Sequence, residues 1–110
     1  MTVVTNELMA AYANELVIDL ERISRYRFAA YLVSPLRTTV AAHFVRLYQQ
    51  EKIEFEQALN YVDILEGETS SISIQLRLPN RAAVTSIIAS ALIKSGFRQA
   101  ESGDTLVLVL

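Results

Sequence analysis

Apolar residues recur at helical spacing near the start of the chain. Thr5 or Asn6 can cap a helix there, because either side chain can accept a hydrogen bond from the first free amides. The apolar residues that follow are three or four positions apart, which places them on one face of a helix: Met9, Tyr12, Ala13, Leu16, Leu20 and Ile23. The pattern predicts a helix that runs to about Ile23.

Residues 25–33 fit two patterns. Arg25 to Phe28 alternates polar and apolar, as a strand does, whereas residues 28–33 suit a helix equally well. A continued helix is favoured, because no glycine, proline or turn cluster separates this stretch from the first helix. Ser34 and Pro35 then mark a break and restart, with Ser34 as the cap of a new helix and Pro35 at its first position.

A second apolar register begins at Leu36 and is nearly continuous, with Glu51 where an apolar residue was due. It predicts either one long helix or two helices with a kink near residues 49–51. Gly67 is the expected end. The apolar positions of this register are Val40, Phe44, Leu47, Tyr48, Phe55, Ala58, Leu59, Val62 and Leu65.

The rest of the chain changes character. Residues 71–78 alternate strictly, which predicts a half-buried strand closed by Pro79 and Asn80. Asn80 is expected to cap a helix that ends at Gly96, the residue in a left-handed cap position. The apolar face of that helix is Val84, Ile87, Ile88, Ala91 and Leu92.

Two more strands are predicted after this helix, over residues 97–101 and 105–110, joined by a hairpin turn at Ser102, Gly103 and Asp104. The last strand is apolar on both faces, which indicates a central or doubly covered strand.

These elements predict one α+β domain over residues 1–110. A long helical hairpin (residues 1–67) precedes a β-α-β-β unit (residues 68–110) with a small three-stranded sheet, and a right-handed crossover makes its first strand parallel to a later one. So small a sheet needs cover, either from the long helices or from a second copy that extends it by dimerisation.

Composition narrows the class of protein. Hydrophobic residues make up 52% and charged residues 20% of the 110 positions, which indicates self-association, a permanent partner, or a helix buried on most sides. The absence of cysteine excludes disulfides, zinc–thiolate sites and thiol nucleophiles. The first residues do not form a signal peptide, and charges interrupt every long apolar stretch, so we expect a cytoplasmic protein that does not enter a membrane.

Charges fall in blocks along the chain. Residues 1–21 contain only acidic charges, residues 22–50 only basic ones, residues 51–68 mostly acidic ones, and the remainder is mildly basic. If the first two helical segments fold back at Ser34 and Pro35, the basic block forms an arginine tip and the acidic blocks lie at the hairpin base. The arginines of this tip are Arg22, Arg25, Arg27, Arg37 and Arg46.

Two interpretations of the arginine tip stay open. Arginine suits bidentate pairing with carboxylates, so the tip is a candidate site for an acidic protein partner or for a second subunit. The charge blocks can equally reflect complementarity between the hairpin and the sheet unit within one chain.

Catalytic chemistry has little support in this sequence. His43 is the only histidine, and it lies between apolar neighbours with neither a second ligand nor a carboxylate at helical spacing. Three glycines do not suffice for a phosphate-binding loop. Acidic pairs such as Glu54 and Glu56 are expected to be solvated. We therefore expect no enzyme, no metal and no cofactor.

Two local resemblances bear on function. Residues 47–63 resemble the C-terminal helical segment of type IV pilus retraction ATPases, but the nucleotide-binding motifs of that family are absent. The helix and hairpin of residues 84–110 are similar in outline to the end of winged-helix domains, which implies nucleic-acid binding. Against this, the exposed helix face has a single base, and the net charge is −2.

The sequence thus predicts a small non-catalytic protein–protein interaction module, such as an adaptor, assembly chaperone or regulatory protein, that forms a homodimer. A nucleic-acid-associated regulator is the alternative. Besides the arginine tip, the expected contacts are a sheet edge at Ile72–Leu78 and whatever covers residues 106–110.

Overall fold

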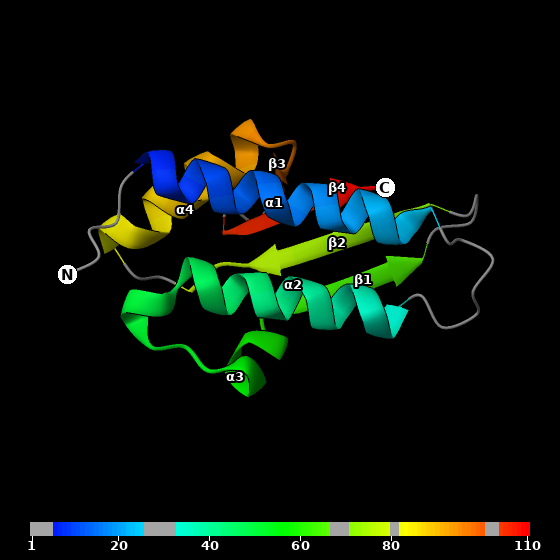
Figure 1. Cartoon of the computed structure of the whole chain (residues 1–110), viewed down its shortest axis with the longest axis horizontal. Coiled ribbons are helices and arrows are strands. Elements are labelled where there is room, and N and C mark those ends of the chain that lie inside the picture. Colours follow the sequence, from blue (N-terminus) through cyan, green and yellow to red (C-terminus); the bar gives the residue numbers. More distant parts are fainter. Residues whose placement is uncertain (1–5, 26–32, 67–70, 80–81, 101–103) are drawn as a thin grey trace.

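The computed structural model describes residues 6–25, 33–66, 71–79, 82–100 and 104–110. Over these residues it contains four α-helices, one short 3-10 helix and a four-stranded antiparallel sheet (Figure 1). The predicted α+β class is confirmed. The elements are α1 (Asn6–Ser24), α2 (Val33–Leu47), η1 (Gln49–Glu51), α3 (Phe55–Leu59), β1 (Val62–Glu66), β2 (Ile72–Arg77), α4 (Ala82–Lys94), β3 (Arg98–Gln99) and β4 (Thr105–Val109).

The first helix is confirmed, because α1 ends at Ser24 and buries the predicted residues Met9, Ala13, Leu16 and Leu20. The choice between helix and strand for residues 25–33 lies mostly outside the described residues. α2 already begins at Val33, one residue before the predicted cap. Its proline lies in the first turn, where a missing amide hydrogen removes no helical hydrogen bond.

The long second helix is wrong beyond Leu47. The chain breaks at η1, where the alternative of a kink was expected, and Lys52 has a left-handed backbone with φ of 54°. The Glu54 amide then donates a hydrogen bond of 3.1 Å to Gln57 Oε1 at the start of the short α3. Residues 62–66 form β1, because their backbone pairs with β2 from Val62↔Leu76 to Glu66↔Ile72. The expected helix end at Gly67 and cap at Asn80 lie outside the described residues.

The sheet has the strand order β1-β2-β4-β3, and every neighbouring pair is antiparallel. It therefore has four strands instead of the predicted three. β2 and β3 run in the same direction, as the crossover through α4 predicted, but β4 lies between them. β4 is central, as its apolar sequence indicated. β2 is also interior, so the predicted free edge at Ile72–Leu78 is wrong, and the edge strands are β1 and β3.

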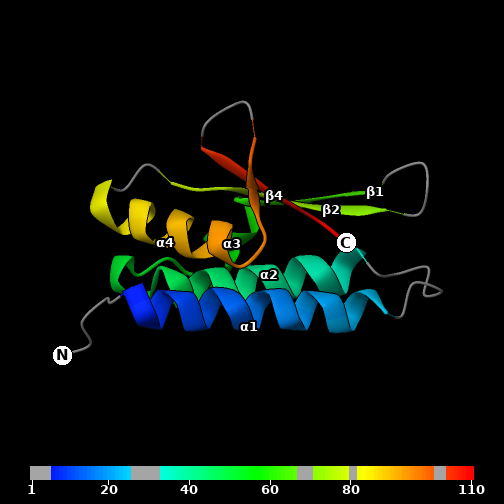
Figure 2. The same cartoon turned by 90° about the horizontal axis from the view of Figure 1, so that it is seen from above.

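All the helices lie on one side of the sheet (Figure 2). α2 packs on β1, α4 packs on β4, and α1 packs on both α2 and α4. The inner sheet face supplies buried residues that meet those of the helices, among them Ile74, Leu76 and Leu106, against Phe44 and Leu92. The opposite sheet face has no helix on it among the described residues.

α4 ends in a Schellman motif that turns the chain back towards the sheet. The Phe97 amide donates to the Leu92 carbonyl at 3.0 Å, and the Gly96 amide donates to the Ile93 carbonyl at 3.2 Å. Gly96 has φ of 126°, a conformation that residues with a Cβ rarely adopt. Phe97 is thereby placed in the core.

Replacing this glycine should destabilise the fold through the backbone alone. A Cβ at position 96 would meet only Leu108 Cδ1, at an ordinary 3.6 Å. Gly96→Ala is therefore expected to lower the free energy of unfolding by about 1–3 kcal/mol, the usual cost of a strained backbone. Urea unfolding followed by circular dichroism measures this. Ser90→Ala, at an exposed position of the same helix, should cost nothing, and an equal loss in both variants would contradict the explanation.

Candidate functional site

Two of the five arginines of the predicted site, Arg22 and Arg46, pair with acidic residues of α1. Glu15 pairs with Arg46, and Asp19 Oδ2 lies 2.7 Å from His43 Nε2, so α1 and α2 run antiparallel with acids of one facing bases of the other. Asp19 also pairs with Arg22 at 2.5 Å. Acidic residues of α1 therefore lie directly against basic residues of α2. The sequence had predicted that the acidic and basic blocks would lie at opposite ends of the hairpin.

Arg46 does not lie at the tip of the hairpin. Arg46 is the second-last residue of α2 and contacts the middle of α1. Its guanidinium also lies 3.9 Å from the ring centroid of Tyr12. The hydrogen bond with Glu15 raises the pKa of the Arg46 side chain. The prediction that all five arginines gather at the tip of the hairpin is wrong for this residue. Arg46 is near the C-terminal end of α2, and in an antiparallel hairpin that end lies far from the turn.

The other arginines differ in the contacts that they make with the described residues. Arg37 donates to the Leu59 carbonyl at 2.9 Å, and Arg77 donates to the Asn60 carbonyl at 2.5 Å, so both satisfy the C-terminal carbonyls of α3. Arg25 is exposed just beyond α1, and Arg27 lies outside the described residues. A role of these side chains in partner binding stays a prediction.

His43 packs between α1 and α2. Its Nε2 contacts Asp19, whereas its Nδ1 is buried without a hydrogen-bond partner among the described residues. No three acidic or histidine side chains in the described part of the chain lie close enough together to hold a metal ion.

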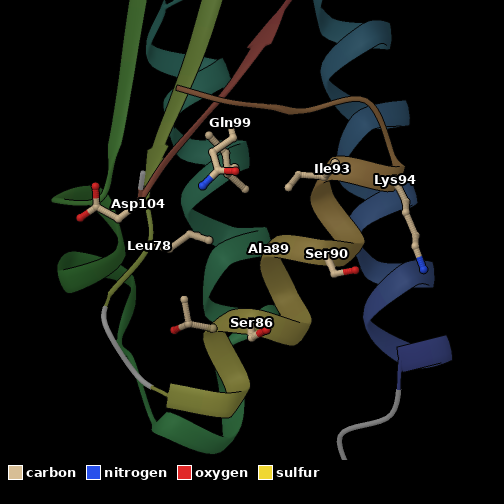
Figure 3. A pocket seen from close by; sticks show the side chains of 10 residues that line it. Leu78, Ser86, Ala89, Ser90, Ile93, Lys94, Gln99 and Asp104 are labelled. Carbon is tan, nitrogen blue, oxygen red and sulfur yellow. The ribbon is translucent and has the colours of Figure 1, made fainter. Parts of the chain in front are cut away.

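A cavity that sequence reasoning missed lies between α4 and the β3–β4 end of the sheet (Figure 3). This α4 groove has a volume of about 690 Å³. Buried Leu78 and Leu106 and half-buried Ala89 form an apolar floor, and Ile93 extends it towards the surface. The exposed rim residues are Ser86, Ser90, Lys94, Gln99 and Asp104.

The α4 groove exists because α4 has two unlike faces. Ile88, Ala91 and Leu92 are buried, whereas Ser86, Ala89 and Ser90 face the groove with side chains too short to fill the space between helix and sheet. The pattern of small residues at helical spacing was visible in the sequence. What was missing was the position of β3 and β4, which supply the opposite wall.

One end of the α4 groove is fixed by hydrogen bonds. The Thr85 hydroxyl donates to the Pro79 carbonyl at 2.6 Å, and Tyr48 Oη lies 3.3 Å from Thr85 Oγ1. Figure 3 shows Leu78 and Ile93 directed into the space between the walls, with Lys94 and Asp104 at opposite rims. The groove is thus a preformed apolar trough with hydroxyl and amide groups on its rim.

Comparisons with protein families, curated proteins and solved structures found no match for this chain. None of the described helices has the length and apolar character needed to cross a bilayer. The geometry of the chain itself therefore carries the functional argument.

The contact made by Arg37 predicts an effect on stability that Arg25, another arginine of the predicted site, does not share. Arg37→Met keeps most of the aliphatic stem but removes the hydrogen bond to Leu59, so it should lower the free energy of unfolding by about 0.5–1.5 kcal/mol. Arg25→Met, which removes no side-chain contact with a described residue, should leave it unchanged. Parallel urea unfolding curves measure both values, and equal stabilities would refute the assigned role of Arg37.

Proposed function

We propose that this chain is a non-catalytic protein–protein interaction module, and that its α4 groove binds an extended peptide segment of a partner protein. The observation that carries the proposal is the apolar floor of Leu78, Ala89 and Leu106 inside a polar rim. Adaptors, assembly chaperones and regulatory proteins all belong to this class.

The chemistry of the α4 groove suits an aliphatic or aromatic side chain flanked by polar residues. The volume of about 690 Å³ accommodates one or two such side chains. Ser86, Ser90 and Gln99 offer donors and acceptors for a peptide backbone. Lys94 and Asp104 lie at opposite rims, so a segment with complementary charges at its two ends would bind in one direction.

The groove offers less for catalysis. It contains two serine hydroxyls, but His43 belongs to the α1–α2 interface and does not line it. A serine nucleophile needs an adjacent base, and the groove-lining residues include no histidine; no hydrogen bond joins Ser86 or Ser90 to Lys94 or Asp104 among the contacts of the described residues. These features support the non-catalytic assignment.

The alternative of a nucleic-acid-associated regulator has one observation in its favour. The order β2-α4-β3-β4, with β4 between the other two strands, is similar to the end of a winged-helix domain. Over residues 84–94 of α4, the exposed side chains are Ser86, Ser90, Ile93 and Lys94, which provide one positive charge for phosphate contacts. The peptide-binding proposal is therefore preferred.

A random peptide library displayed on phage tests the proposed function directly. Selection against the wild-type chain should enrich sequences with an aliphatic or aromatic anchor. Ala89→Trp fills the groove, and Ile93→Asp charges its wall without removing buried packing, so each should weaken an enriched peptide at least about tenfold. Fluorescence anisotropy with the labelled peptide measures the affinities.

Ile18→Asp provides the matched control for this test, because Ile18 is comparably exposed but lies on α1, away from the groove. It should leave peptide affinity unchanged. The proposal would be refuted if no peptide is enriched. It would also be refuted if the Ala89→Trp and Ile93→Asp variants bind an enriched peptide as tightly as the wild type does. Enrichment failure together with tight binding of duplex DNA at low salt would favour the nucleic-acid alternative.

A further inference from the structure

The face of the sheet opposite the helices has no helix on it among the described residues. It carries the apolar side chains of Leu65, Val107 and Val109 together with the polar ones of Ser73, Gln75, Arg77 and Thr105. Register partners in an antiparallel sheet share a face, so the pairs of β1, β2 and β4 define its rows. One row is Leu65, Ser73 and Val109, and Leu65 and Val109 are 49% and 63% exposed. These are two of the five large exposed apolar residues in the described chain, and they flank a small serine. We call this surface the open sheet face.

The next row places opposite charges at the two ends of the open sheet face. It runs Asp63, Gln75, Val107 and Arg98, one residue from each strand in the order β1-β2-β4-β3. Asp63 and Arg98 are both exposed, and neither forms an ion pair with a described residue. An acid lies on one edge strand and a base on the other. If a second copy of the row is laid over the first in the opposite order, each acid therefore faces a base.

We propose that a second copy of this chain packs on the open sheet face. The two-fold axis lies midway between the two sheets, runs parallel to the strands, and passes over the gap between β2 and β4. This operation reverses the strand order, so β1 lies over β3 of the partner and β2 lies over β4. Asp63 of each copy then faces Arg98 of the other, at the roughly 10 Å spacing of stacked sheets. The interface is isologous, as a two-fold dimer requires.

The second row fits under the same operation. Val109 of each copy lies over Ser73 of the other, so a branched apolar side chain meets a small one. In the charged row, Val107 lies over Gln75. Bulky residues are thus opposed to small or flexible ones on both sides of the axis, which permits close packing of the two central strands.

The charge pattern also selects this axis over its main competitor. A two-fold axis across the strands, through the charged row, would place each strand over its own copy. Asp63 would then face Asp63, and Arg98 would face Arg98. Two like-charge contacts oppose that arrangement, whereas two opposite-charge contacts favour the axis along the strands.

This inference deepens the proposed function by naming one partner, and it uses a surface separate from the α4 groove. The groove lies on the helix side of the sheet, and its wall residue Gln99 points to the opposite side from Arg98. Dimerisation and peptide binding can therefore fail independently. A monomeric wild type that still binds peptides would refute only the dimer, and a dimer that binds no peptide would refute only the groove.

Sedimentation velocity over a range of protein concentrations tests the dimer through a charge exchange. The wild type should dimerise. Asp63→Arg and Arg98→Asp each replace two attractive contacts with two repulsive ones, so each should raise the dimer dissociation constant roughly tenfold or more. The double variant with both changes restores opposite charges across the interface and should regain an affinity within about threefold of the wild type.

Two further variants separate this interface from others. Val109→Arg places a charge near the axis and should abolish the dimer, whereas Ile18→Arg, on the exposed side of α1, should leave it intact. Circular dichroism verifies the fold of each variant. A dimer that extends the sheet through the edge of β1 would ignore Arg98→Asp. That result, a monomeric wild type, or a double variant that stays as weak as the single ones would overturn the proposal.

Discussion

The pairing of β2 with β4 organises the rest of the molecule. Five register pairs, from Ser73↔Val109 to Arg77↔Thr105, join two segments about thirty residues apart in the chain. The inward side chains of these two strands, Ile74, Leu76, Leu106 and Leu108, are all buried and form the base on which the helices rest. β1 and β3 each add to one side of this central pair. Without it, β1 would be half of an isolated hairpin, which is marginally stable in water.

The path from β2 to β4 explains the α4 groove. α4 must pack its apolar face on α1 while its end returns the chain to the sheet, and the Schellman motif at Gly96 makes that return. α4 thus contacts both α1 and β4, and the α4 groove lies between the helix and the β3–β4 end of the sheet. Serine and alanine on its sheet-facing side leave the space open. The floor residues Leu78 and Leu106 belong to the core, whereas Gln99 and Asp104 on the sheet side of the groove are exposed.

The helices and strands with strong local signals were predictable from sequence, and those that depend on pairing were not. α1, α4 and the strands β2 and β4 follow from apolar spacing and from the glycine at the end of α4. β1 was missed because Val62 and Leu65 also fit the helical register of the preceding segment. Only hydrogen bonding with β2 decides that residues 62–66 are extended, and such pairing leaves no local mark.

The candidate sites show the same division. The arginines were visible as a block of charge, but sequence order does not reveal that Glu15 would pair with Arg46 or that Arg37 would bind the end of α3. The two surfaces that carry the proposals are built from residues distant in sequence. Leu78, Ala89 and Leu106 meet only through the topology β2-α4-β3-β4, and Asp63 and Arg98 share a row only because β1 and β3 are the two edges.

Some of the apolar residues of the chain lie on the open sheet face. β4 is apolar on both faces, and the helices cover only one of them. Leu106 and Leu108 are buried inward, while Val107 and Val109 point outward beside Leu65 and Ser73. Antiparallel strands with one face in water usually alternate apolar residues on the covered face with polar residues on the exposed face. Val107 and Val109 depart from this pattern. Their apolar character costs hydration in a monomer and is recovered when the face is covered. The last strand therefore has the sequence of a strand between two layers, and the chain itself supplies one of them.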